Sequence, residues 1–255
     1  MVSNSVGFLK TCMLIVNAVV IYGHPKLPEE MPLCKRNDPN LNECLKSAIQ
    51  TSVSVLANVG IPELDVPSID PLHIHEILVH QNSTHSVRIS LALNHADVIG
   101  LSNIEIQSVD ADWDKCKIRI DMKSSPLMIV GDYKVDGKIM VLPIFGEGKF
   151  NFSFNEGGEG HIELSGRPEV RDGKTYMITE SVTWDYKPNH LFMNLDNLFN
   201  GDKARGIQMN AFLNDNWEDV LDEVKDVTQA SFGDTFKDIA KLIFDKVPLD
   251  SIAIE

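Results

Sequence analysis

The sequence predicts an α+β protein in which a long C-terminal α-helix is wrapped by a highly curved antiparallel β-sheet. The middle of the chain alternates apolar and polar residues with a period of two, as half-buried antiparallel strands do. Near the C-terminus the apolar residues recur at steps of three and four, as in an amphipathic helix. That helix would be about 50 Å long at the usual rise per residue. A helix so long in a small domain needs an equally long partner, which a strongly curved sheet can supply.

Composition and charge narrow the class of protein. The chain has 255 residues, of which 43% are hydrophobic, and this near-average composition excludes a disordered or fibrous protein. It carries 37 acidic against 23 basic residues, a formal net charge of −14. Such a chain is repelled by phosphate backbones and anionic headgroups, so we expect no nucleic-acid partner.

The N-terminus predicts a secretory signal peptide over residues 1–23. The segment Val6 to Ile21 is mostly apolar, and its core, Cys12 to Tyr22, is too short to span a membrane. A buried N-terminal helix is the alternative, which the polar, Pro-rich segment that follows disfavours. We expect residues 24–255 to form a single secreted domain, a monomer with no stable membrane insertion.

The first predicted helix covers residues 38–58. Asp38 suits the N-cap and Pro39 the first helical position, while Gly60 and Pro62 end the apolar pattern.

Three stretches alternate strictly and predict strands. Their apolar residues are Val87, Ile89, Leu91 and Leu93; Ile118, Ile120 and Met122; and Phe150, Phe152 and Phe154. Asp136-Gly137 is a strong hairpin signal between two apolar runs. Gly157-Gly158 and Asp172-Gly173 mark two further turns.

The C-terminal pattern predicts one long helix from Asn214 to Val247, in which Gly233 is a candidate position for a bend and Pro248 is the stop. Its apolar stripe consists of Trp217, Val220, Leu221, Val224, Phe232, Phe236, Ile239 and Ile243.

Three cysteines remain after removal of the signal peptide, in a chain whose export permits disulfides. A bridge between Cys34 and Cys44 would close a short polar loop and fasten an N-terminal strand to the first helix. Cys116 is then left over, either as a buried thiol, which we prefer, or with an intermolecular partner. The sequons at Asn82 and Asn151 are candidate glycosylation sites.

Motifs for catalysis and metal binding are absent from the sequence. It has no Gly-x-Ser-x-Gly, His-Glu-x-x-His or phosphate-binding glycine loop. Asp110-x-Asp112-x-Asp114 begins like a calcium loop, but Lys115 stands where glycine is needed. His73, His75 and His80 are more simply solvated histidines than zinc ligands. We expect no enzyme activity, no metal and no cofactor.

Several segments resemble the insect takeout and juvenile hormone-binding protein family. They are the disulfide segment Cys34–Cys44, a strand motif at Gly100–Asn103, the first signature at Gly131–Ile144, and the second at Asn214–Leu221, continuing to Phe244–Pro248. Only Cys116 is available for the second disulfide of the hormone-binding branch, so the chain resembles the takeout branch more closely.

This resemblance implies a tubular lipid-binding fold with a hydrophobic tunnel, in a family with circadian and feeding-related members. It implies a secreted extracellular carrier, in haemolymph or a sensory or secretory fluid, of a juvenile hormone-like terpenoid, a fatty acyl chain or another lipid. The alternatives are an extracellular signalling protein with a receptor partner, and a secreted esterase. Candidate tunnel residues are Ile118, Ile120, Met122, Phe150, Phe152, Phe154, Trp217, Val220, Leu221, Val224, Phe232, Phe236 and Ile239. Each could equally be ordinary core.

Overall fold

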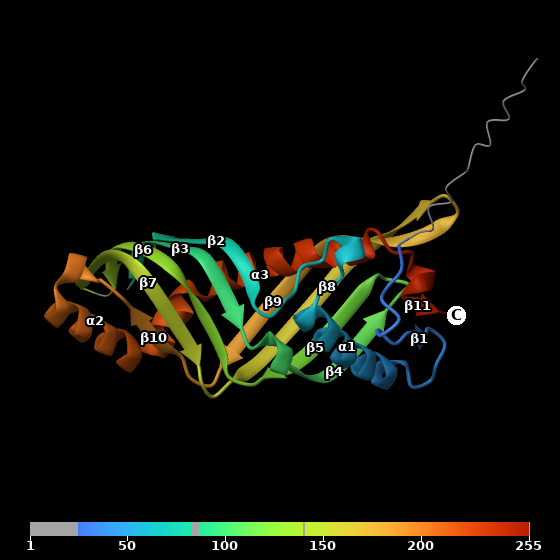
Figure 1. The fold of residues 1–255 in the computed structure, drawn as a ribbon, viewed down its shortest axis with the longest axis horizontal. Helices are drawn as coiled ribbons and strands as arrows, with labels where there is room; N and C mark the ends of the chain where they lie inside the picture. The colour runs from blue at the N-terminus through green and yellow to red at the C-terminus, as the bar shows by residue number, and fades with distance from the viewer. Residues whose placement is uncertain (1–24, 83–86, 140, 255) are drawn as a thin grey trace, which may run out of the picture.

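A computed structural model describes residues 25–82, 87–139 and 141–254. The protein is elongated, and two curved sheets follow one another along its long axis (Figure 1). The elements, in chain order, are β1 (Cys34–Lys35), α1 (Leu41–Asn58), β2 (Leu72–Asn82), β3 (Val87–Ile99), β4 (Glu105–Asp112), β5 (Lys117–Ser124), β6 (Leu127–Ile139), β7 (Leu142–Phe154), β8 (Gly158–Arg171), β9 (Lys174–Pro188), β10 (Phe192–Leu195), α2 (Lys203–Asp215), α3 (Trp217–Phe244) and β11 (Ala253–Ile254), with short 3₁₀ turns between them.

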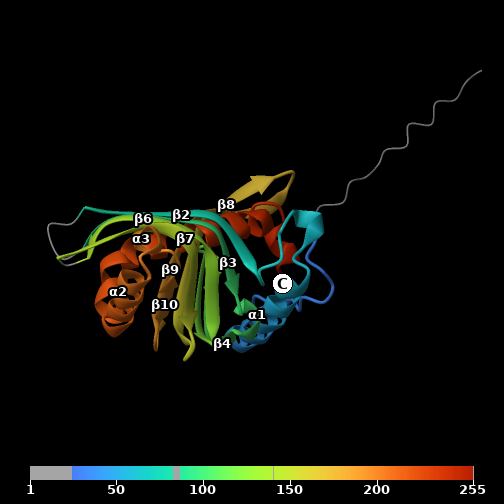
Figure 2. The ribbon, with the colours of Figure 1, turned by 60° about the vertical axis from the view of Figure 1, so that its left-hand side comes forward.

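Two antiparallel sheets form the body of the protein. The strand order is β10-β7-β6-β3-β2 in the five-stranded sheet and β4-β5-β8-β9 in the four-stranded sheet. Helix α3 packs along β9 and also contacts β2, so it bridges edge strands of both sheets. Helix α1 covers β4, and α2 lies beside β10 at the opposite end (Figure 2). The predicted α+β fold, a long helix against curved antiparallel sheets, is confirmed.

Period-two alternation determines which side of each sheet is buried. On β5, Ile118 and Met122 are buried, while Arg119 between them is exposed. On β7, Phe150 and Phe154 are likewise buried. The apolar face of each sheet therefore turns toward α3 and the interior, as the alternation predicts.

The helices begin and end differently from the prediction. Helix α1 starts at Leu41, because the Asp38 carboxylate accepts a hydrogen bond from the Asn40 amide at 2.8 Å and forms a turn before the helix. The predicted single helix from Asn214 is wrong at its start, since that residue belongs to α2 and α3 begins at Trp217. Helix α3 ends at Phe244 and continues through Gly233 without interruption.

The hairpin predicted at Asp136-Gly137 is wrong, because both residues lie within β6. Strand pairing continues to Ile139 opposite Leu142, which places the turn after Ile139. Gly137 is needed there for close approach, since a Cβ atom would lie 2.2 Å from the carbonyl oxygen of Arg88 on β3. The turns predicted at Gly157-Gly158 and Asp172-Gly173 do connect β7 to β8 and β8 to β9.

The segment Gly100–Asn103 also differs from its prediction as a strand motif. It forms a 3₁₀ turn between β3 and β4. The Asp70 carboxylate stabilises this turn by accepting hydrogen bonds from the Gly100 and Ser102 amides, each at 2.9 Å.

The cysteine predictions are confirmed. Cys34 and Cys44 form a disulfide, which joins β1 to the first turn of α1. Cys116 is a buried free thiol, and burial raises its pKa. The predicted signal peptide lies outside the described residues. Within residues 25–82, 87–139 and 141–254, no helix is both long and apolar enough to cross a membrane.

Candidate functional site

An apolar cavity lies inside the end of the molecule that carries the five-stranded sheet. This first cavity has a volume of about 160 Å³, close to that of an engineered cavity that binds benzene. Strands β2, β3, β6, β7, β9 and β10 contribute to its wall, as do α2 and α3. An apolar concavity with few polar groups is the usual form of a small-molecule site.

Three polar side chains of α3 also line the first cavity, and each has a partner. The Lys225 ammonium lies 3.2 Å from the Asp185 carboxylate on β9, to which the Gln229 amide also donates. The Thr228 hydroxyl donates to the Val224 carbonyl oxygen at 3.0 Å. Because these polar groups bind Asp185 or the helix backbone, apolar stems and methyl groups remain to face the cavity.

A second apolar cavity, of about 230 Å³, lies toward the disulfide end. It is lined by α1, by the inner face of β4, β5 and β8, and by the C-terminal turn of α3. Cys34 is part of its wall, so the disulfide fixes one edge of this space. Among the described residues, none lines both cavities, so the continuous tunnel implied by the resemblance stays a prediction.

The structure divides the candidate site residues into three groups. Those that line the first cavity are Phe152, Phe154, Val220, Leu221, Val224 and Phe232. Ile118 and Ile120 line the second cavity. Met122, Phe150, Trp217, Phe236 and Ile239 pack in the surrounding core and line neither. Their role in ligand binding stays a prediction.

Other lining residues were absent from the candidate list. Trp184 and Tyr186 of β9 line the first cavity, as do Leu91 and Leu93 of β3. The alternation of Leu91 and Leu93 was visible in the sequence, and that of Trp184-Asp185-Tyr186 offered the same signal. Trp113 lines the second cavity from a position without any repeating pattern.

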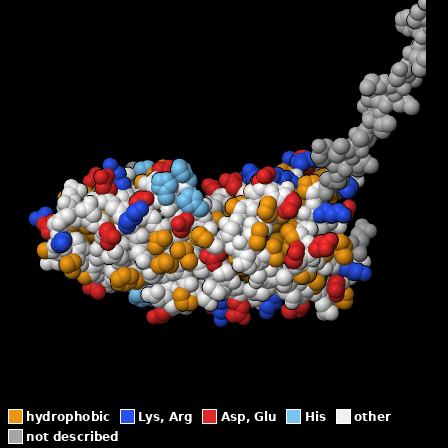
Figure 3. Space-filling view, viewed as in Figure 1, with side chains coloured by type: hydrophobic (Ala, Val, Ile, Leu, Met, Phe, Trp, Pro, Cys, Tyr) orange, Lys and Arg blue, Asp and Glu red, His pale blue; other side chains and the backbone are white. Residues whose placement is uncertain are grey.

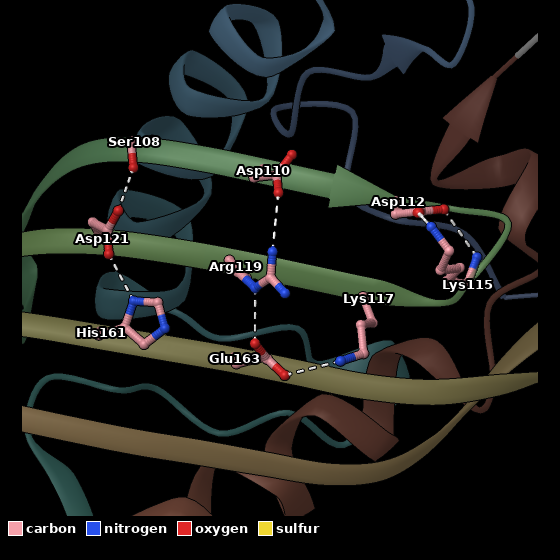
Figure 4. Close-up of polar contacts among 9 residues, drawn as sticks. All are labelled: Ser108, Asp110, Asp112, Lys115, Lys117, Arg119, Asp121, His161 and Glu163. Atoms are coloured by element: carbon pink, nitrogen blue, oxygen red, sulfur yellow. Dashed lines mark hydrogen bonds and ion pairs between the residues drawn. The ribbon is translucent and has the colours of Figure 1, made fainter.

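The outer face of the four-stranded sheet is a network of charges. Figure 4 shows the Arg119 guanidinium between Asp110 and Glu163, and Asp121 between Ser108 and His161. The Arg119 and Lys117 partners lower the pKa of Glu163, and hydrogen bonds from Ser108 and His161 lower that of Asp121. The strands that wall the second cavity thus carry a stable ionised face toward solvent.

The histidines noted in the sequence contact one another or nearby polar side chains. His73 and His75 both contact the ring of His95, and Figure 3 shows histidines gathered on one face of the molecule. His73 also binds Asp97 at 2.9 Å, and His80 contacts Ser90. Among the described residues, no group of three His, Cys, Asp or Glu side chains is placed to hold a metal ion.

The asparagines of the two sequons lie on different strands of the five-stranded sheet. Asn82 ends β2, and the rest of its sequon lies outside the described residues. Asn151 is half-buried on β7, where its side-chain oxygen accepts a hydrogen bond from the Ser153 hydroxyl at 2.8 Å. Glycosylation of either stays a prediction.

Comparisons with known proteins agree with this architecture. A family model described as "Haemolymph juvenile hormone binding protein (JHBP)" matches residues 11–253. The chain is 25% identical to the circadian clock-controlled protein daywake of Drosophila melanogaster in an alignment of 232 residues that covers 88% of this chain and 86% of the relative. The daywake protein of Drosophila yakuba matches to the same extent.

A solved structure extends the match to three dimensions. The crystal structure of Epiphyas postvittana Takeout 1 is similar to this fold with a TM-score of 0.74 and 27% identity. The similarity covers 87% of this chain and 98% of that one. Because the family model spans nearly the whole sequence and the fold agrees, this chain belongs to the takeout and haemolymph juvenile hormone binding protein family.

Proposed function

We propose that this protein is a secreted carrier that binds a small hydrophobic ligand in the first cavity. The observation that supports the proposal most directly is the apolar cavity itself, in a family described by its binding of a hormone. The Cys34–Cys44 disulfide supports location of the protein in an oxidising, extracellular compartment such as haemolymph or a secretory fluid.

The lining favours ligands that are mainly hydrocarbon. Each buried methylene contributes about 0.8 kcal/mol, so a terpenoid or fatty acyl chain gains most of its affinity without polar contacts. Lys225 and Gln229 already bind Asp185, so the described wall offers little to fix a polar headgroup. We infer that the ligand class is defined by shape and length more than by its functional group.

A charge placed in the wall tests this proposal. Val224 lines the first cavity from α3, and Val224→Asp would put a carboxylate against bound hydrocarbon. Ala230→Asp is the matched control, because Ala230 is exposed on the same helix. We expect native mass spectrometry and fluorescence titration to show binding of a monoterpenoid or a medium-chain fatty acid by the wild type and the control. The Val224→Asp protein should bind at least tenfold more weakly. Equal affinity of a folded Val224→Asp protein would place the ligand elsewhere.

The same preparations test the two alternatives. Release of a hydrolysed product from an ester ligand by the wild type, and not by heat-denatured protein, would indicate an esterase. Secreted protein that contains no extractable lipid and binds none of the probes would favour a receptor-directed interaction protein.

A further inference from the structure

A pair of aromatic rings lies where the first cavity ends and the second begins. Trp184 on β9 lines the first cavity, whereas its direct strand partner on β8, Ile162, lines the second. On α3, Phe232 lines the first cavity and Ile243 the second, and Phe236 lies between them. The Trp184 and Phe236 rings meet edge to face at 5.2 Å and form what we call the aromatic wall.

Contacts on several sides hold Trp184 in this position. Its ring stacks on Tyr186 at 5.7 Å with an interplanar angle of 7°. The Tyr186 hydroxyl is in turn hydrogen-bonded to Ser124 at 2.7 Å, which fixes the stacking partner. A rotation of Trp184 that joined the cavities would have to break its contacts with both Tyr186 and Phe236.

The backbone beneath the ring is shaped to admit it. Gly160 on β8 lies under Trp184, and a Cβ atom there would be 3.0 Å from the Trp184 ring and 3.0 Å from Met122. Any other residue at this position would push the indole or Met122 away. The glycine therefore leaves room for the large ring between residues that line the first cavity and residues that line the second.

We propose that Trp184, supported by Phe236, sets the maximum length of ligand that the protein accepts. The inference rests on the proposed carrier function, and it assigns the aromatic wall as the place where the apolar end of the ligand stops. The first cavity alone is close in volume to a cavity that holds benzene, so a chain of fifteen or more carbons does not fit wholly inside it. Only removal of the wall gives such a chain access to the second cavity of about 230 Å³.

A series of saturated fatty acids from eight to twenty carbons measures the limit. In the wild type we expect the dissociation constant to fall about fourfold per added methylene until the chain end reaches the wall, and then to level off. In Trp184→Ala the fall should continue for about four further carbons. Phe236→Ala opens the helix side of the same wall and should shift the limit in the same direction, so it decides the question if Trp184→Ala does not fold. Val170→Ala is the control for loss of an apolar side chain, because Val170 is exposed near the end of β8 and lines neither cavity.

A fluorescence readout locates the chain end directly. The chain has three tryptophans, so a Trp113→Phe, Trp217→Phe double variant leaves Trp184 as the single emitter. A fatty acid of the limiting length with bromine at its terminal carbon should quench this emission more than one brominated beside the carboxyl group.

The outcomes separate the two proposals. Affinity that rises through twenty carbons in the wild type, or the same limit in wild type and both wall variants, would overturn the role of the aromatic wall while the carrier function stands. Failure of the wild type and all variants to bind any member of the series, or a terpenoid, would instead reject the carrier function.

Discussion

Helix α3 packs closely on β9 at Gly233. This contact predicts that a single added methyl group will destabilise the protein, although alanine favours the helix more than glycine does. Gly233 is buried in the middle of α3. A Cβ atom there would lie 2.8 Å from the carbonyl oxygen of Val182 on β9. The substitution Gly233→Ala therefore forces the helix away from the strand that carries Trp184, or distorts the strand.

Two opposing effects determine the size of the change. Alanine stabilises a helix interior over glycine by about 0.8–1 kcal/mol. Overpacking in a close-packed interior costs about 1–3 kcal/mol, and the upper part of that range applies here because a backbone oxygen cannot rotate away as a side chain does. We expect Gly233→Ala to lower the free energy of unfolding by about 1–2 kcal/mol.

Helix α2 offers a matched control for this prediction. Gly206 is also helical, but a Cβ atom there would be 3.8 Å from its nearest neighbours, both atoms of Leu198. Gly206→Ala should therefore raise the free energy of unfolding by about 0.5–1 kcal/mol. Urea denaturation of the two variants and the wild type, followed by circular dichroism, measures both changes. An equal gain in stability for both variants would show that α3 does not approach β9 as closely as described.

Three further predictions concern other parts of the fold. Replacing Cys34 and Cys44 with serine should lower the free energy of unfolding by about 2–3 kcal/mol, because the bridge closes a loop with a sequence separation of 10; denaturation under identical non-reducing conditions checks this. Phe152→Asp buries a carboxylate at the first cavity and should abolish ligand binding. Asn151→Asp, on the outer face of the same strand, should leave binding unchanged. A Phe152→Asp protein that still carries ligand would contradict the predicted register. Burial raises the pKa of Tyr133 from about 10 to about 12. The stabilisation by the protonated phenol is therefore complete below pH 10 and is lost as the pH rises through 12. Tyr133→Phe should flatten the pH dependence of the free energy of unfolding over that range.

Much of the fold was visible in the sequence because its elements have strong periods. The alternation around Ile120 and Phe152 identified both the strands and their inward faces. The stripe on α3 identified a helix with one apolar side, and the spacing of Cys34 and Cys44 suited a local disulfide. In each case the physical requirement, burial of one face or closure of a short loop, acts over a few neighbouring residues.

Predictions failed where a distant part of the chain decides the local structure. Asp136-Gly137 has strong turn chemistry, but pairing of β6 with β3 and β7 extends the hairpin beyond it. Helix α2 has only Met209 and Leu213 buried, so its apolar pattern was too weak to be recognised. Its packing against β10 supplies the missing contacts, and no local pattern encodes that neighbour.

The difference between a filled core and a hollow one was the hardest feature to predict, and α3 shows why. Val224, Phe232 and Phe236 lie on one apolar stripe, yet the first two line the first cavity and the third packs against Trp184. The regular spacing of apolar residues predicts only that their side chains turn inward. Whether it meets another side chain or an open space depends on how large the residues opposite are, and those belong to β9, a strand far away in the sequence. Gly160 and Trp184 illustrate the point, because the absence of a side chain at Gly160 on β8 leaves room for the Trp184 ring on β9.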